Sequence, residues 1–196
     1  GRNDQGTDSR LEQRVLEALR ENSCSASVLP VRSVGVQGDQ RTYPPPAVLW
    51  ETPEDWNWLE EQSIRITNSV REINRVVLLL KPAALTPLKI REAYCTQERL
   101  DLLRKADAIA TKTLMEHDLM RDIFQLLVIL LPISEDGKGD SIVLRPVCSE
   151  DVMTAQFARL DWDLLNSLKQ SLSNLPRIDA VLYDITHKPP ATFGWE

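Results

Sequence analysis

The stretch E-I-N-R-V-V-L-L-L at residues 72–80 has a counterpart in R-I-D-A-V-L-Y-D-I at residues 177–185. Each contains an apolar, β-branched run of strand length and follows a stretch with helical periodicity. Upstream of each helical stretch the sequence predicts two further strands, so the order strand, strand, helix, strand occurs twice. The shared I-[ND]-x-V opening favours duplication of one module over a chance arrangement. The sequence therefore predicts an α+β fold with two tandem ββαβ units.

In the first unit, β-branched residues predict a strand over 28–36, and an extended segment follows at 47–51. A helix is predicted over residues 53 to about 71, with Thr52 as its N-cap and Pro53 in its first turn. The apolar stripe expected to face the core consists of Trp56, Leu59, Ser63, Ile66 and Val70.

In the second unit, residues 126–133 and 141–147 are predicted strands, joined by the turn S-E-D-G-K-G-D. Asp161 is expected to cap a helix, which ends at the Asn174-Leu175-Pro176 segment. Because each helix carries a single apolar stripe, we expect the helices to pack on one face of each sheet. The stripe of this second helix consists of Leu164, Leu165, Leu168 and Leu172.

A long helix over about 96–119 is predicted to join the two units, and a short helix over 10–21 to precede them. The chain is accordingly divided into four parts. These are a disordered leader at 1–10, the first unit with its N-terminal helix at 11–84, a helical connector at 85–122, and the second unit with a C-terminal tail at 123–196.

Composition excludes several classes of function. Lys and Arg total 23 against 29 Asp and Glu, and the net charge of −6 argues against a nucleic-acid partner. Three scattered cysteines indicate a reducing compartment, for which we expect a cytoplasmic location. The longest apolar run, 126–131, is far short of the ~20 residues that a membrane helix needs, so no membrane association is expected. No metal site and no catalytic nucleophile constellation is visible.

Two segments have features that suggest binding. In S-V-G-V-Q-G-D-Q-R-T-Y, residues 33–43, the glycines permit close backbone approach, and polar side chains follow a predicted strand. In D-I-T-H-K-P-P-A-T-F-G-W-E, residues 184–196, Lys188 precedes two prolines that stiffen the chain, so it could present a point charge to a phosphate. The alternatives are a plain strand with a turn, and an ordinary polar tail.

These segments resemble the C-terminal domain of the GMP synthetase family, glutamine-hydrolysing enzymes that convert XMP to GMP. The pattern V-G-V-x-G-D-x-R-x-Y is met at 34–43, and D-F-M-T-A-x-x-A-R-L is met at 151–160 with Val152 in place of Phe. The closing pattern Y-D-I-T-S-K-P-P-A-T-x-E-W-E is met at 183–196, except at His187 and Gly194. The long interval between the first two patterns is similar to the long form of the family found in many eukaryotes, which holds two such units.

The resemblance implies a segment that forms a homodimer contact and supplies part of an XMP site, together with the ATP pyrophosphatase domain of the parent protein. The parent enzyme would use ATP and Mg, whereas this segment would bind no cofactor and would not catalyse alone. Lys188 would pair with the 5′-phosphate of XMP. The positions that match family XMP contacts are Gln37, Gln125, Lys188, Phe193 and Gly194, with Asp39 and Arg41 as supporting residues.

Two hypotheses from different classes follow. In the first, the chain is an excised ligase domain that dimerises, binds XMP and works only with the rest of the enzyme. In the second, it is a scaffolding or regulatory module that kept the fold without the chemistry. The missing N-terminal methionine favours the first, whereas Gly194 favours the second because the family usually has a glutamate there.

Overall fold

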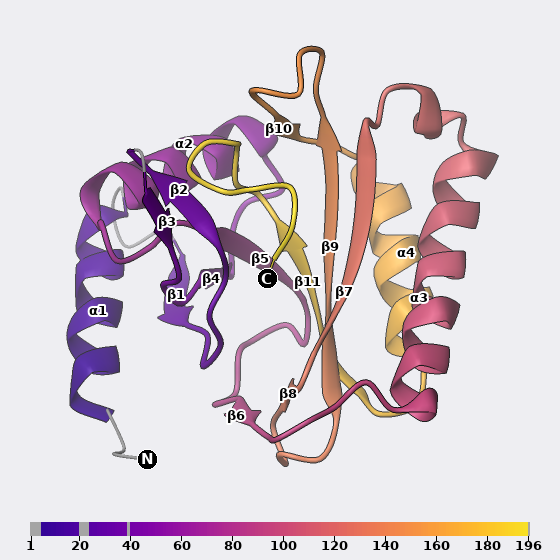
Figure 1. The fold of residues 1–196 in the computed structure, drawn as a ribbon, viewed down its shortest axis with the longest axis horizontal. Helices are drawn as coiled ribbons and strands as arrows, with labels where there is room; N and C mark the ends of the chain where they lie inside the picture. Colours follow the sequence, from indigo (N-terminus) through magenta and orange to yellow (C-terminus); the bar gives the residue numbers. More distant parts are fainter. Residues whose placement is uncertain (1–4, 20–23, 39, 196) are drawn as a thin grey trace.

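One mixed β-sheet runs through the computed structural model, which describes residues 5–19, 24–38 and 40–195, with the side chains of 5–8 excepted. Its strand order is β1-β4-β5-β11-β9-β10, and β7 also pairs with β9 (Figure 1). The strands are β1 (Ser25–Val28), β4 (Ala47–Trp50), β5 (Val76–Lys81), β7 (Gln125–Leu131), β9 (Asp140–Cys148), β10 (Gln156–Phe157) and β11 (Ile178–Asp184).

The sheet consists of two ββαβ units, which confirms the predicted fold. In the first, β1 is antiparallel to β4, and α2 (Trp56–Ser69) connects β4 to the parallel strand β5. In the second, β7 is antiparallel to β9, and α4 (Trp162–Ser173) connects β9 to the parallel strand β11. The units meet where β5 pairs with β11 in the antiparallel sense. Because equivalent strands pair antiparallel, an approximate two-fold rotation relates the units.

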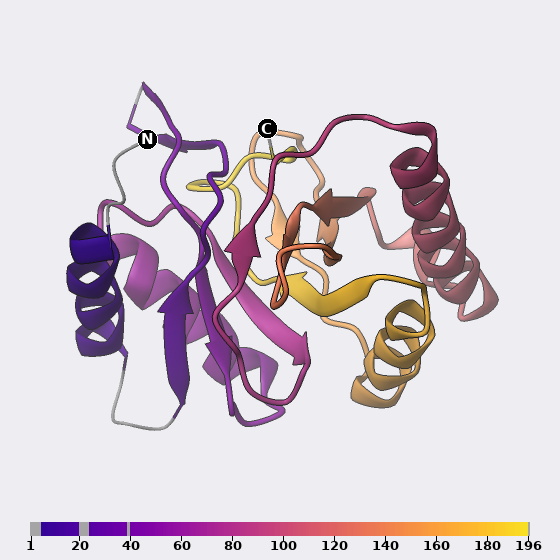
Figure 2. The same cartoon turned by 90° about the horizontal axis from the view of Figure 1, so that it is seen from below.

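The described helices cover one face of the sheet (Figure 2). Helix α1 (Gln5–Ala18) packs beside α2, and α3 (Gln97–Glu116), followed by the 3₁₀ turn at Leu119–Arg121, packs against β7 and α4. The opposite face, called here the open face, is covered by loops and by the tail, residues 186–195. Two small two-stranded sheets accompany it, formed by β2 (Gly35–Gln37) with β3 (Gln40–Thr42) and by β6 (Lys89–Ile90) with β8 (Ile133–Ser134).

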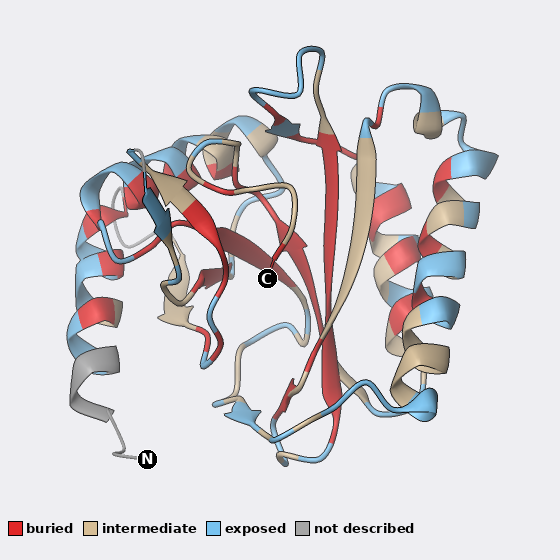
Figure 3. Ribbon diagram, in the orientation of Figure 1, coloured by how far each residue is buried: buried red, intermediate tan, exposed pale blue. Residues whose placement is uncertain are grey.

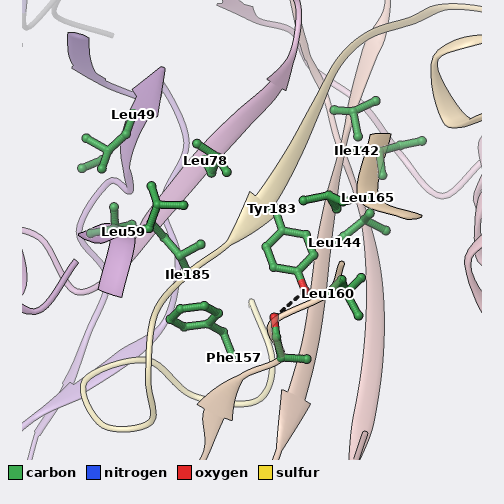
Figure 4. Packing of buried hydrophobic residues seen from close by; sticks show 14 of the residues in the cluster. Leu49, Leu59, Leu78, Ile142, Leu144, Phe157, Leu160, Leu165, Tyr183 and Ile185 are labelled. Atoms are coloured by element: carbon green, nitrogen blue, oxygen red, sulfur yellow. Dashed lines mark hydrogen bonds between the residues drawn. The ribbon is translucent and has the colours of Figure 1, made fainter. Parts of the chain in front are cut away.

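The central strands are buried on both faces (Figure 3). Leu49, Leu78, Leu144 and Tyr183 pack under the helices, where the Tyr183 hydroxyl donates to the Ala158 carbonyl at 2.7 Å (Figure 4). The residues between them in the same strands lie on the open face, because successive side chains of a strand point to opposite faces of the sheet. These are Val48, Val77, Val143 and Leu182, joined there by Trp195 of the tail.

The helical stripes predicted from the sequence are confirmed, but three local predictions are wrong. Asp55, not Thr52, caps α2, because its carboxylate accepts from the amides of Asn57 and Trp58. The strand predicted over 28–36 is interrupted: β1 ends at Val28, and Pro30 has no amide to donate to a ladder. Helix α1 begins at Gln5, so residues 5–10 do not form a disordered leader.

Candidate functional site

Three segments far apart in the sequence meet at the tail (Figure 1). On one side, Gly35 of the β2–β3 hairpin bridges Ala191, and the Val36 amide donates to the Pro190 carbonyl at 2.8 Å. On the other side, Ala155 bridges Lys188, with backbone hydrogen bonds of 2.8 and 3.0 Å. The tail therefore lies between residues 33–43, which carry one of the other two patterns seen in the sequence, and residues 149–155, which include the first half of the second.

The hairpin depends on glycine at position 35. A Cβ added there would lie 2.2 Å from Nδ2 of Asn74, a distance that no real contact allows. Asn74 is fully buried, and its Nδ2 donates to the Ser33 carbonyl and to Oγ1 of Thr42. The absence of a side chain at Gly35 therefore lets the hairpin close over Asn74 and reach the tail.

Beneath the tail lies a buried charged cluster of Arg75, Arg145 and Asp184, whose side chains have no exposed surface. Nη1 of Arg75 is 2.6 Å from one carboxylate oxygen of Asp184, and Nη1 of Arg145 is 3.0 Å from the other. Nε1 of Trp195 also donates to this carboxylate, at 2.9 Å. A single buried carboxylate thus joins both units and the tail.

The two guanidinium groups of this cluster hold the tail by its backbone. Arg75 donates to the carbonyl of Gly194 at 2.8 Å and to that of Val34 at 2.9 Å. Arg145 donates to the carbonyls of Thr192 at 2.8 Å and Thr186 at 3.1 Å. These are charge-assisted bonds from fully buried guanidinium groups, so they fix the course of the tail.

The ionisation of the cluster follows from competition between burial and charge. Burial opposes ionisation of Asp184, but Arg145 and Arg75 outweigh it and leave the pKa of Asp184 below its ordinary value. Burial lowers the pKa of Arg145 to about 10, against the opposing effect of Asp184. Asp184 and Arg145 are therefore both charged at neutral pH, and the cluster sets two guanidinium groups against one carboxylate beneath the tail.

Lys188 and Phe193, two of the predicted site residues, lie together. Nζ of Lys188 is 4.2 Å from the centre of the Phe193 ring and donates to the Val152 carbonyl at 2.5 Å. The Phe193 ring is also 5.4 Å from the ring of Phe124, the residue before Gln125. Gln125 opens β7 and is half-buried. The structure thus brings the Lys188 end of the tail close to the start of β7.

The other predicted residues are placed differently. Gln37 lies on the other side of the tail from Gln125, and its Nε2 donates to the Ile73 carbonyl at 3.3 Å. Together with Pro189 and Pro190 it lines a cavity of about 640 Å³. Gly194 has no side chain to offer and uses its carbonyl to accept from Arg75. Arg41 is exposed on β3, and Asp39 lies outside the described residues.

Sequence reasoning missed the buried cluster. The signal was present, because Arg75 directly precedes the apolar run 76–80 and Arg145 interrupts the largely apolar strand β9, where a charge is out of place unless it is paired. Within the described ranges, no three His, Cys, Asp or Glu side chains are grouped so that they could hold a metal ion. Over the same ranges, no helix combines the length and apolar character needed to cross a membrane.

Comparison with known proteins agrees with the resemblance seen in the sequence. Residues 112–195 match the family model described as GMP synthase C terminal domain. A probable glutamine-hydrolysing GMP synthase of Leptospira interrogans is 37% identical over 178 residues, which are 90% of this chain and 30% of that protein. The GMP synthase of Streptomyces coelicolor is 46% identical over 110 residues, covering 52% of this chain and 21% of the relative. The chain spans less than a third of the length of these curated relatives.

Proposed function

We propose that this chain, whose residues 112–195 match the family model described as GMP synthase C terminal domain, uses its tail to complete the XMP site of a GMP synthase. The observation that supports this most is the meeting of three separate segments around Lys188 and the buried cluster that fixes them. A tail that is already fixed in one conformation before the substrate arrives loses little conformational entropy on binding. The cluster would thus preorganise the tail for the nucleotide.

Lys188 is the residue proposed to bind the 5′-phosphate. Its ammonium group is at present satisfied by the Val152 carbonyl and the Phe193 ring, both of which are neutral. A phosphate dianion is a stronger acceptor than a peptide carbonyl, so it would displace Val152 as the partner of Nζ. Gln37 and Gln125 would contact the remainder of XMP from opposite sides of the tail.

The role of the segment is binding rather than bond formation. In the proposed reaction, XMP, ATP and glutamine give GMP, AMP, diphosphate and glutamate. The ATP, the Mg and the glutamine would be handled by other parts of the parent protein. A lone lysine at a surface holds a phosphate weakly, because water screens the pair. The site would therefore gain its affinity when the ATP pyrophosphatase domain closes over the tail.

The test is kinetic and uses the full-length enzyme. We expect Lys188→Ala to raise the Michaelis constant for XMP at least tenfold while glutamine hydrolysis is unchanged. Lys89→Ala, on the exposed strand β6, is the matched control and should behave as the wild type. Calorimetry should show at most weak binding of XMP to the 196-residue chain. An unchanged Michaelis constant in Lys188→Ala would favour the scaffolding alternative.

We further propose that the chain associates as a homodimer through strand β7. In the described part of the sheet, β7 pairs only with β9, so its outer edge is open. It is seven residues long, apolar apart from Gln125, and mostly half-buried. A long apolar edge strand is a ready template for pairing with a second copy. Leu127→Lys should yield a monomer in equilibrium sedimentation with an unchanged circular dichroism spectrum, and a wild-type chain that is already monomeric would contradict the proposal.

A further inference from the structure

We propose that a second cavity, separate from Lys188, binds a nucleoside di- or triphosphate. This cavity, the arginine groove, has a volume of about 710 Å³ and lies between helix α1, the end of the β2–β3 hairpin and the turn after α2. Four arginines line it, together with an exposed tyrosine. They are Arg10, Arg14, Arg32, Arg71 and Tyr43.

The groove has a positive charge that the described residues do not neutralise. Its one carboxylate, Glu72, pairs with Arg14 at 2.6 Å. Arg32 donates to the backbone carbonyl of Tyr43, which carries no charge. Arg10 and Arg71 have no hydrogen bond or ion pair with the described residues. Three arginine charges therefore face one cavity in a chain whose net charge is −6.

The groove has an excess of positive charge that three other cavities lack. The cavity beside β10 has Glu150 and Asp151 as its charged lining residues, and the charged residues of the one beside Pro82 are all carboxylates. In the cavity beside α3, three cationic side chains are matched by three carboxylates. Like charges repel, so gathering unpaired arginines costs stability unless an anion joins them. Guanidinium groups match phosphate oxygens in pairs of parallel hydrogen bonds, and several positive charges favour a ligand with more than one phosphate.

The rest of the lining fits a nucleoside. Tyr43 is 50% exposed although its ring is large and apolar, and Pro44, Pro45 and Leu11 continue the apolar wall. A base can stack on an exposed aromatic ring for roughly 1–3 kcal/mol. The volume lies within the range of about 300–1,000 Å³ that is usual for small-molecule sites. The lining thus combines an aromatic and apolar surface that suits a base with arginines that suit a polyphosphate.

The groove is distinct from the part of the proposed XMP site around Lys188, although Gln37 belongs to both. Lys188, Phe193 and Gly194 do not line it, and it is formed by the first unit rather than by the tail. Gln37, Thr42 and Arg71 line both the groove and the neighbouring 640 Å³ cavity, so the two spaces adjoin. A ligand in the groove would therefore sit beside the hairpin that holds the tail.

The experiment is a calorimetric titration of the 196-residue chain with ATP, ADP, AMP, adenosine and tripolyphosphate. We expect affinity to fall at least tenfold from ATP to AMP, and adenosine to bind too weakly to measure. Arg71→Gln and Arg32→Gln should each weaken ATP binding about tenfold, whereas Arg121→Gln, an exposed arginine outside the groove, should not. Tyr43→Ala should weaken ATP binding but leave tripolyphosphate binding unchanged.

Lys188→Ala separates this inference from the proposed XMP site, since ATP binding should persist in that variant. Loss of ATP binding in Lys188→Ala with retention in Arg71→Gln and Arg32→Gln would overturn the assignment. So would the absence of ATP binding at millimolar concentration, or equal weakening by Arg121→Gln. ATP binding that is no tighter than tripolyphosphate binding and that is unaffected by Tyr43→Ala would show a plain polyphosphate site and overturn the nucleoside part.

Discussion

The two ends of the open face occupy equivalent positions in the duplicated fold but differ in chemistry. The pairing of Val48 with Val77 in the first unit corresponds to that of Val143 with Leu182 in the second. The positions two residues before or after these pairs along the strands are therefore equivalent in the two units. One end of the open face has Arg75, Arg145 and Asp184, and the residues at the equivalent positions of the other end are, in the same order, Ala180, Trp50 and Leu79.

Each end of the open face is covered by the segment that follows the last strand of one unit. At the charged end, the tail after β11 joins the β2–β3 hairpin; at the apolar end, β6 after β5 pairs with β8. The apolar end holds its cover by burial, which has no direction. The charged end holds the tail by directed hydrogen bonds to named carbonyls. We infer from this difference that apolar packing is sufficient for the fold, whereas the buried charged cluster is needed to fix the course of the tail.

The largest expected effect is that of Asp184→Asn. It would leave Arg75 and Arg145 buried without a counter-charge, and breaking a buried pair costs about 3–5 kcal/mol of unfolding free energy. Urea denaturation measures this loss, with Asp107→Asn on the exposed side of α3 as the control. A loss below 1 kcal/mol would show that the two ends are held alike.

The same carboxylate should make stability depend on pH. Its pKa is lowered in the folded state, so its contribution is complete above the unfolded value of about 3.9 and is lost as pH falls through the folded value. We therefore expect the unfolding free energy of the wild type to fall below about pH 4. In Asp184→Asn this part of the acid dependence should disappear, and an unchanged acid profile would contradict the prediction.

A smaller effect is expected for Trp195→Phe, which keeps an aromatic ring on the open face but removes the N–H that donates to Asp184. A hydrogen bond to a charged group contributes roughly 1.5–3 kcal/mol. Trp50→Phe, at the equivalent apolar end, is the control, because Trp50 has no counterpart to this bond among the described contacts. Equal losses of unfolding free energy in both variants would remove the distinction between the ends.

The sequence predicted the features that repeat along the chain. Leu164, Leu165, Leu168 and Leu172 recur at helical spacing, and all are buried in α4. The closing strands at 72–80 and 177–185 were identified by their shared pattern, and they form the centre of the sheet. Periodicity reports which face of an element is buried, so it was sufficient for the fold class.

Features that depend on tertiary context could not be predicted in this way. Thr52 and Asp55 are both acceptable N-caps, and only the geometry of the chain after β4 decides between them. A charge beside or within an apolar run signals that Arg75 and Arg145 are paired, but nothing local identified Asp184 as the partner of both. For the site, the resemblance named Gln37 and Gln125 as well as Lys188, Phe193 and Gly194. The contact of Lys188 with Phe193 and the position of Gln37 across the tail depend on how the tail crosses the sheet.

The smallest expected change in stability belongs to the most extensive substitution, in which the charged end receives the residues of the apolar end. The triple variant Arg75→Ala, Arg145→Trp, Asp184→Leu removes every member of the cluster at once. Replacing a whole buried ion-pair network by apolar groups is often neutral or stabilising by about 1–4 kcal/mol, unlike the loss of one partner. We therefore expect an unfolding free energy no lower than that of the wild type. The carbonyls of Thr192 and Gly194 would nevertheless lose their donors. Amide exchange in residues 186–195 should then accelerate at least tenfold, while exchange in β5 and β11 stays slow. A tail that remains as protected as in the wild type would show that apolar packing alone can fix its course, and the charged end would then have no separate role.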